Sequence, residues 1–147
     1  ENPHFSILGL HWSSQSDSFT YNFDLTLEAP TKRKVLSLIA QIYDPCGFLS
    51  PCIMTAKCFM QLLWTSGCGW DEPLSPELAG KWHLFVSDLN NIVKIAIPRP
   101  LMLSGSTLCE LHGFSDASES GYAAVVYLRC TNNSGEVRVT QVIAKTR

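Results

Sequence analysis

The spacing of apolar residues predicts a β-hairpin at the start of the chain. Residues 5–12 are largely apolar, and residues 18–27 alternate between apolar and polar side chains, with Phe19 and Tyr21 on the apolar face. A period of two with aromatic residues is typical of strands that bury one face. We therefore expect two paired strands within residues 1–30.

A helical period begins after this hairpin. Thr31 is the expected N-cap, and the apolar residues from Val35 to Ile42 recur at helical spacing. Residues 44–47, Asp-Pro-Cys-Gly, should end this helix, because proline lacks an N–H group and glycine permits the turn.

Two further helices are expected, and each begins with a serine–proline pair. Ser50 is the expected cap of the second helix, which continues to about Trp64, and Ser75 is the expected cap of the third. Proline suits the first helical position because its missing N–H would have no partner within the helix there. Residues 97–100, Ile-Pro-Arg-Pro, should end the third helix.

The last third of the chain returns to the pattern of strands. Apolar runs at 108–114, 122–130 and 137–144 predict three consecutive antiparallel strands, and residues 131–135 provide a hairpin-type turn. A hairpin, three helices and a three-stranded meander together indicate an α+β fold. We expect the boundaries between these three segments near residues 30 and 104.

Composition and charge exclude some classes of protein. The chain has 147 residues, 46% of them hydrophobic, and a net charge of −2, so it has no overall attraction for nucleic acid or an anionic membrane. No apolar run is long enough to span a membrane. The six cysteines form no Cys-x-x-Cys pair, and we expect reduced thiols in an intracellular protein. Both ends of the sequence look like cuts in a longer polypeptide.

Asp116 is the residue with the most evident chemical use. An apolar strand leads to it, and small residues up to Gly121 and a second apolar strand follow it. A carboxylate at the mouth of a sheet can bind a divalent metal, although two-metal phosphodiester chemistry needs several carboxylates. The alternative is that Asp116 caps the turn between Ser115 and Gly121. His112, on the same strand, could face the same site or be an ordinary surface or core histidine.

The basic run Lys32, Arg33 and Lys34 is the candidate nucleic-acid contact. Positive charge at a helix N-terminus opposes the macrodipole, a cost that phosphate binding could offset, and the alternative is a solvated face. The sequence shows no nucleophile elbow, phosphate-binding glycine loop or convincing Cys–His pair. Asp116-Ala-Ser118 also lacks the glycine of an aspartic peptidase motif.

Several motifs together resemble the Pol polyprotein of Bel/Pao-type LTR retrotransposons. They are Thr31-Lys-Arg-Lys at the first helix, Tyr43-Asp-Pro-Cys-Gly-Phe-Leu-Ser-Pro51, Phe114-Ser-Asp-Ala-Ser118, Gly121-Tyr-Ala-Ala-Val-Val-Tyr127 and Val142-Ile-Ala-Lys-Thr-Arg147. The resemblance implies a hairpin that closes a reverse-transcriptase palm in residues 1–30. It implies a thumb- or connection-like helical segment in 31–104. Residues 105–147 would be the first part of a truncated RNase H-like domain.

The resemblance also implies roles for the candidate residues. Asp116 would be the first catalytic metal carboxylate, with Mg²⁺ or Mn²⁺ in the complete RNase H-like domain and none in the fragment alone. Lys32, Arg33 and Lys34 would contact template–primer phosphates. The implied partners are an RNA–DNA hybrid or template–primer duplex and the remainder of the Pol polyprotein, in the cytoplasm or in virus-like particles. The remaining carboxylates would follow the third strand, so the segment should be catalytically incomplete alone.

Two alternatives remain open at this stage. The family region is also named a Pao retrotransposon peptidase, which would make Asp116 the catalytic residue of an aspartic peptidase, with two copies sharing a proton between their carboxylates. The other alternative is a domesticated, non-catalytic interaction module.

Overall fold

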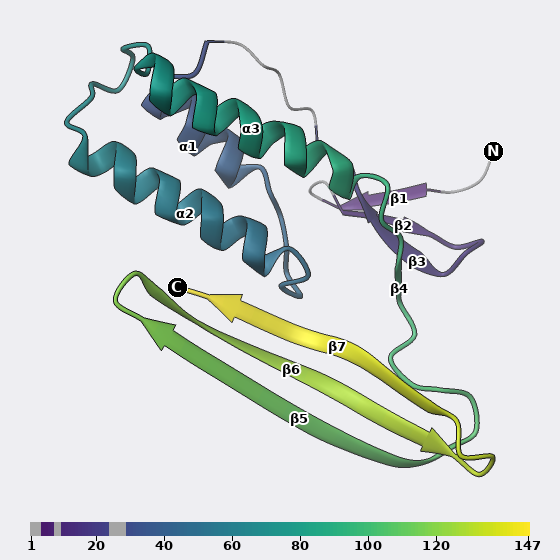
Figure 1. Cartoon of the computed structure of the whole chain (residues 1–147). Helices are drawn as coiled ribbons and strands as arrows, with labels where there is room; N and C mark the ends of the chain where they lie inside the picture. The colour runs from purple at the N-terminus through teal and green to yellow at the C-terminus, as the bar shows by residue number, and fades with distance from the viewer. Residues whose placement is uncertain (1–3, 8–9, 24–28) are drawn as a thin grey trace.

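The described part of the chain is an α+β fold with a layer of helices over an antiparallel sheet (Figure 1). The structure is a computed structural model, and it describes residues 4–7, 10–23 and 29–147. Within these residues, three helices lie over a three-stranded sheet, and a small four-stranded sheet lies at one end of the helical layer. The predicted fold class is therefore confirmed.

Two of the three predicted helix caps are present. Helix α1 (Lys32–Ala40) begins after Thr31, whose side chain accepts a hydrogen bond from the Lys34 backbone N–H. Helix α3 (Pro76–Ile92) begins after Ser75, whose side chain accepts from the Leu78 N–H. These bonds satisfy N–H groups that the first helical turn leaves unpaired.

The predicted cap of the second helix is wrong. Helix α2 (Ser50–Thr65) has Leu49 as its N-cap, and no side chain caps it by a hydrogen bond. The reason lies in the preceding loop, where the Asp44 carboxylate accepts the backbone N–H groups of Phe48 and Leu49, at 2.9 and 2.7 Å. Asp44 thus organises the entry into α2, and Ser50 lies already within the helix.

The small sheet contains more strands than the sequence indicates. The run 5–12 is not one strand, because β1 (His4–Ile7) and β2 (Leu10–Ser13) pair with each other and Ile7 lies opposite Leu10. The two halves of this segment thereby satisfy each other's backbone N–H and C=O groups. Strand β3 (Ser18–Tyr21) follows, and β4 (Ile97–Pro98), expected only as a helix stop, pairs with it. The predicted continuation through residues 24–27 lies outside the described residues.

The C-terminal sheet is the predicted meander, with longer strands. Its order is β5 (Ser106–Ser118), β6 (Gly121–Asn132) and β7 (Val137–Thr146), all antiparallel neighbours. Only residues 119–120 separate β5 from β6. Ser118 closes this turn, since its hydroxyl donates to the Gly121 carbonyl and accepts from the Ser120 N–H. Asp116 is therefore not the turn cap; it pairs with Ala123 inside the strand.

Two clusters of buried side chains hold the helical layer together. One lies between the three helices, and the other joins the helices to the small sheet. These clusters contain most of the buried apolar side chains among the described residues, and burial of a large one contributes about 1.5–3 kcal/mol. The first consists of Val35, Met60, Leu63, Leu74, Trp82 and Val86, and the second of Tyr21, Ile42, Leu49 and Leu89.

Residues 44–49, which we call the joint loop, bond to the small sheet on one side. The Tyr21 hydroxyl on β3 donates a hydrogen bond of 2.7 Å to the Asp44 carboxylate. Burial, followed by this bond, raises the pKa of Tyr21, so the phenol stays protonated and remains a donor.

On its other side the joint loop contacts β7. The Ala144 N–H donates to the Cys46 carbonyl at 2.9 Å, and the Gln141 side chain donates to the Gly47 carbonyl at 3.0 Å. Gly47 has φ of +74°, and a Cβ there would overlap the backbone of Ala144. The joint loop therefore connects the small sheet, the beginning of α2 and strand β7.

Within the described residues, no helix has the length and apolar character needed to cross a membrane.

Candidate metal-carboxylate site

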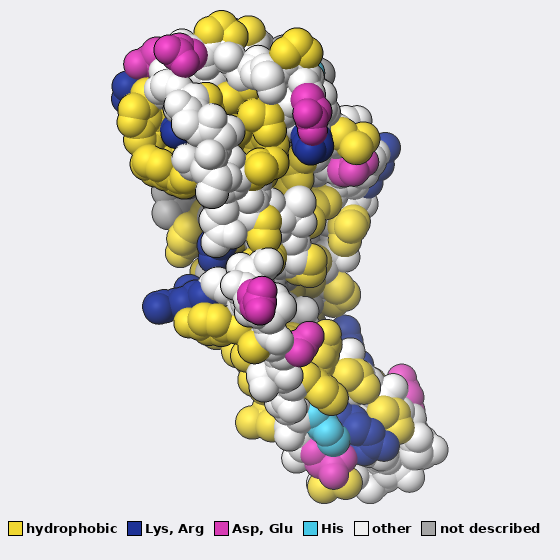
Figure 2. Space-filling model, turned by 60° about the vertical axis from the view of Figure 1, so that its left-hand side comes forward, with side chains coloured by type: hydrophobic (Ala, Val, Ile, Leu, Met, Phe, Trp, Pro, Cys, Tyr) yellow, Lys and Arg dark blue, Asp and Glu magenta, His cyan; other side chains and the backbone are white. Residues whose placement is uncertain are grey.

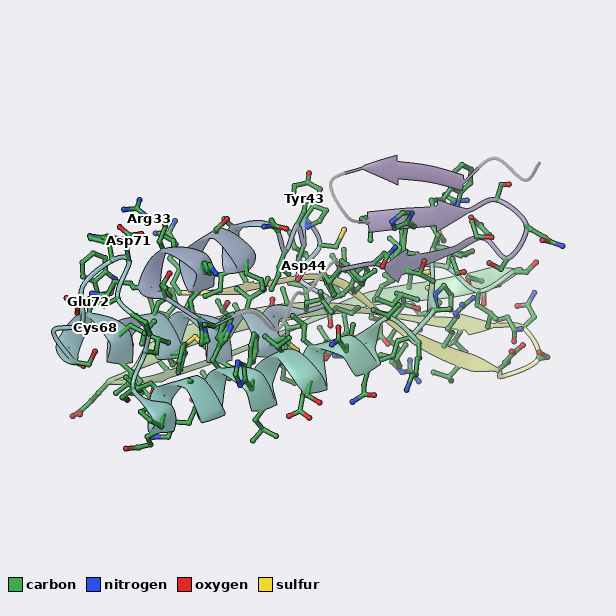
Figure 3. All side chains as sticks on the ribbon, turned by 90° about the horizontal axis from the view of Figure 1, so that it is seen from above. Arg33, Tyr43, Asp44, Cys68, Asp71 and Glu72 are labelled. Carbon is green, nitrogen blue, oxygen red and sulfur yellow. The ribbon has the colours of Figure 1, made fainter. Side chains whose placement is uncertain are left out.

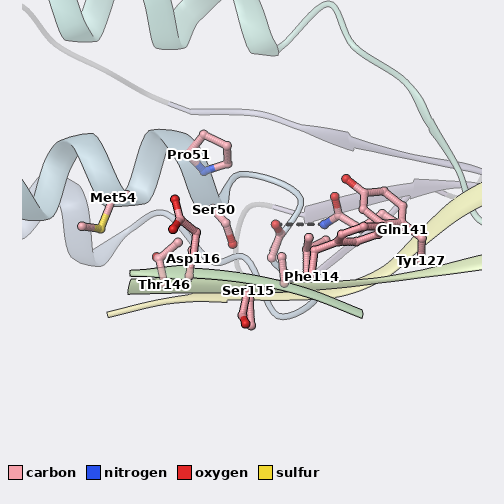
Figure 4. A pocket seen from close by; sticks show the side chains of 14 residues that line it. Ser50, Pro51, Met54, Phe114, Ser115, Asp116, Tyr127, Gln141 and Thr146 are labelled. Atoms are coloured by element: carbon pink, nitrogen blue, oxygen red, sulfur yellow. Dashed lines mark hydrogen bonds between the residues drawn. The ribbon is translucent and has the colours of Figure 1, made fainter. Parts of the chain in front are cut away.

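Asp116 lies near the end of β5 and faces α2 across a pocket. Asp116 pairs with Ala123 on β6, which pairs with Thr146 on β7, so the three residues form one row across the sheet. Directly paired residues share a face of an antiparallel sheet. In Figure 4 the Asp116 side chain points from this face toward the beginning of α2.

The pocket between the sheet and α2 has a volume of about 450 Å³. Ser50, Pro51 and Met54 line it from the helix, and Phe114 and Val125 are among the apolar residues that line it from the sheet. Among the residues that line this pocket, Asp116 is the acidic one. Its Oδ1 accepts a hydrogen bond of 2.9 Å from the N–H of Ala117, and the residue is exposed to solvent.

Helix α2 is fixed to this end of the sheet by a lysine. The Lys57 Nζ donates a hydrogen bond of 2.8 Å to the carbonyl of Thr146, the last residue of the row that contains Asp116. Gly121, where β6 begins, lies so close to Met54 that a Cβ there would overlap the Met54 methyl group. The position of Asp116 relative to α2 is therefore set by contacts on both sides.

The residues present supply one metal ligand and not a complete metal site. A carboxylate oxygen is a suitable ligand for Mg²⁺ or Mn²⁺. Within residues 10–23 and 29–147, however, no group of three or more His, Cys, Asp and Glu side chains could hold an ion. Glu110 is six residues from Asp116, about 20 Å along a strand, and it accepts from Arg129 at 2.8 Å.

His112 shares a face with Asp116 but not a site. Its Nε2 lies 3.9 Å from the Glu110 carboxylate. Four residues of strand, about 13 Å, separate it from Asp116. His112 is thus a member of a surface group with Glu110 and Arg129, as the alternative of an ordinary surface histidine expects.

The three residues of the basic run have different environments. Lys32 is buried, and its Nζ donates to the Cys68 carbonyl at 2.9 Å while lying 4.6 Å from the Trp64 ring centroid and 5.6 Å from that of Trp70. A cation held between aromatic faces and a carbonyl stabilises the packing of α1 on the loop after α2. The Lys32 ammonium is therefore already bound within the protein by these contacts.

Arg33 forms a two-pronged ion pair on the surface. Its Nε and Nη2 donate to the two Asp71 carboxylate oxygens at 2.7 and 3.0 Å (Figure 3). The hydrogen bond from Arg33 holds the pKa of Asp71 below its usual range. The side chain of Lys34 is exposed, as is that of Arg33.

The structure does not bring Asp116 and the basic run together. Met54 lines the pocket of Asp116, and Trp64 contacts Lys32. Ten residues of α2 separate these two positions, which corresponds to about 15 Å. On the face shown in Figure 2, basic and acidic side chains are scattered among hydrophobic ones rather than gathered in one basic patch.

The comparison with protein families identifies the chain. A family model described as the Pao retrotransposon-like RNaseH-like domain matches residues 31–147, from the cap of α1 through β7. The chain belongs to this family. The predicted relation to a Pao-type retrotransposon Pol polyprotein is thereby confirmed. No curated protein and no solved structure matches the chain.

The α2 side of the pocket was not predicted as part of the site. Ser50 and Pro51 were assigned only to a helix start, although both stand in the segment that resembles Pao-type Pol sequences. In this member of the Pao RNaseH-like family, that segment lies over the strand that carries Asp116. Its presence in a Pol-like motif was the available signal.

Proposed function

We propose that Asp116 is the first metal carboxylate of an RNase H-type site that cleaves RNA in RNA–DNA hybrids. The observation that carries this proposal is that Asp116 lies in the first of three consecutive antiparallel strands, in a chain of an RNaseH-like family. The other ligands come from other parts of the Pol polyprotein. RNase H-like domains usually use divalent metals, and here the metal would polarise the scissile phosphate and activate the attacking water.

The strand position also bears on the peptidase alternative. An aspartic peptidase needs its aspartate in a loop beside the same loop of a second copy, since the two carboxylates share a proton. Asp116 instead pairs with Ala123 within the β5–β6 ladder, two residues before β5 ends at Ser118. This supports metal-carboxylate chemistry over proteolysis.

Replacement of Asp116 by asparagine tests the proposal. In the complete Pol polyprotein, we expect Asp116→Asn to reduce Mg²⁺- or Mn²⁺-dependent hybrid cleavage by about 100-fold or more, because an amide is a poor metal ligand. The measurement is the initial rate on an RNA–DNA hybrid. Glu119→Gln is the matched control, because it removes the same charge from the exposed turn three residues away.

Two results would contradict the assignment. One is cleavage by Asp116→Asn at the unaltered rate. The other is an equal loss in Glu119→Gln, which would make the effect one of general charge. Asp116 is exposed, so its replacement should leave the melting temperature unchanged.

We also propose that Arg33 and Lys34 contact a phosphate of the same nucleic acid. Their exposed side chains support this, whereas the buried ammonium of Lys32 contributes by positioning α1. In this proposal residues 1–30 close the reverse-transcriptase palm, residues 31–104 form a thumb- or connection-like segment, and residues 105–147 begin the RNase H-like domain. The protein thus links polymerase and nuclease, in the cytoplasm or in virus-like particles.

The ion pair with Asp71 provides a test of the arginine. If Arg33 binds phosphate, Asp71→Asn should tighten hybrid binding, because the carboxylate no longer competes for the guanidinium. Arg33→Gln should weaken binding and reduce the salt slope by about one. Lys81→Gln, on an exposed pair with Glu77 in α3, is the control. Unchanged affinity in both Arg33→Gln and Asp71→Asn would refute the contact.

A further inference from the structure

A pair of cysteines faces across the hairpin of β5 and β6, at the end far from Asp116. Cys109 lies directly opposite Cys130, and their Sγ atoms are 2.9 Å apart. No register shift occurs between Leu108 and Ser118, so the pairing is regular around both cysteines.

The hydrogen-bond pattern of β6 places this pair in a favourable position. Tyr122 exchanges both of its backbone hydrogen bonds with Arg147, on the β7 side. Successive residues of a strand direct these groups to opposite sides, and the β6–β7 register shift at Val126–Tyr127 places its extra residue, Val142, on β7, so the alternation along β6 is unbroken. Cys130, eight residues after Tyr122, therefore also bonds toward β7. Cys109 and Cys130 are therefore a non-hydrogen-bonded pair, with Cα atoms about 4.5 Å apart. A disulfide needs a Cα separation of about 4.4–6.8 Å.

The two sulfurs differ in access. Cys109 is exposed, whereas Cys130 has none of its surface exposed. A reagent in solution can reach the first thiol, and the second lies in contact behind it. This is the arrangement of an attacking cysteine and a resolving cysteine.

We propose that Cys109 and Cys130 form a reversible thiol–disulfide site whose co-reactant is a small disulfide such as oxidised glutathione. The Cys109 thiolate attacks one sulfur of the small disulfide, the S–S bond breaks, and the leaving thiolate takes up a proton. The Cys130 thiolate then attacks Cys109 Sγ and releases the second small thiol. Two electrons pass from the protein to the small disulfide, and the two thiol protons end on the two released thiols.

The bond would join the strand that carries Asp116 to its neighbour. A disulfide between Cys109 and Cys130 closes a loop that contains the whole β5–β6 turn and constrains the unfolded chain. The oxidised protein should therefore melt about 5–10 °C higher than the reduced one. Reduction by an excess of small thiol reverses the change.

The test is a titration of the intact chain with mixtures of reduced and oxidised glutathione. Mass spectrometry should show the loss of two hydrogens and one cross-linked peptide that contains Cys109 and Cys130. Cys109→Ser should abolish this product. Cys130→Ala should abolish it as well, and alanine is chosen there because Cys130 is buried and needs a small apolar replacement. Cys58→Ser, in α2, is the control and should still form the product.

Three outcomes would overturn the inference. They are a lasting glutathione adduct on Cys109, a cross-link that uses any other cysteine, and an unchanged mass at the most oxidising ratio. The site does not involve Asp116, so none of these outcomes depends on hybrid cleavage.

Discussion

Replacing Gly47 by alanine is expected to destabilise the protein by about 3 kcal/mol. The residue has φ of +74°, a region that costs an L-residue with a Cβ about 1–2 kcal/mol. In addition, the new Cβ would overlap the backbone of Ala144 on β7, with Ala144 Cα only 2.9 Å away. Relief of such an overlap in packed structure costs about 1–3 kcal/mol. Chemical denaturation measures the change in unfolding free energy.

Gly67→Ala separates the two contributions. Gly67 has a similar φ of +69°, but a Cβ there would meet nothing within 4 Å. It should therefore cost only the backbone part, about 1–2 kcal/mol. In Gly47→Ala, the N–H of Ala144, which donates to the Cys46 carbonyl, should also exchange faster with solvent. Equal destabilisation by the two replacements would contradict the close approach of the joint loop to β7.

Replacement of Asp44 by alanine is the second large effect, with an expected loss of about 3 kcal/mol. The carboxylate accepts three hydrogen bonds, from the Tyr21 hydroxyl and from the N–H groups of Phe48 and Leu49. A hydrogen bond to a charged group contributes about 1.5–3 kcal/mol. Because Asp44 is only half-buried, water offsets part of the loss, and the total is expected to be smaller than the sum of three such bonds. Tyr21 is almost completely buried, so its hydroxyl cannot turn to water.

A mutant cycle resolves the contribution of the tyrosine. We expect Tyr21→Phe alone to destabilise less than Asp44→Ala, and to add little when combined with it, because both remove the same bond. Asp71→Ala is the control, since its pair with Arg33 is exposed and should contribute less than about 1 kcal/mol. If the two aspartates have equal effects, the proposed organising role of Asp44 is wrong.

Local patterns in the sequence were sufficient to predict most elements. Thr31 and Ser75 cap the helices as expected, since a cap depends only on residues within three positions. The three apolar runs and the turn in the last third correctly predicted a meander of three strands. The strands are longer than predicted because backbone pairing extends past their apolar centres, as far as Ser118 in β5.

Features that depend on distant residues were not predictable. Asp44 was interpreted as part of a helix stop, since its partner Tyr21 lies on another element. The β3–β4 pairing joins segments separated by the whole helical layer. Similarly, the basic run has no local sign that Lys32 would enter a contact with Trp64 and Trp70. Sequence periodicity reports which side of an element is buried, but not what covers it.

The candidate site likewise combines a feature that the local sequence predicts with one that depends on distant residues. Asp116 was selected because of its position after an apolar run, and the structure places it on a pocket. The pocket itself depends on α2, whose contact with the sheet is set by Lys57 and by the joint loop. None of these contacts is visible in the hydrophobic pattern.

The joint loop has a consequence for how this region of a retroelement can be divided or exchanged. A cut between residues 104 and 105 separates the helices from the sheet along the chain, but the loop's bonds to Gln141 and Ala144 cross that cut. A sheet expressed from residue 105 onward would uncover the half-buried Val125, which lines the space under α2, and would add it to the already exposed Phe114. Recombination between related elements at that boundary would combine a loop and a β7 that had not evolved together. Exchange of the unit from Thr31 onward keeps both partners of this contact in one piece.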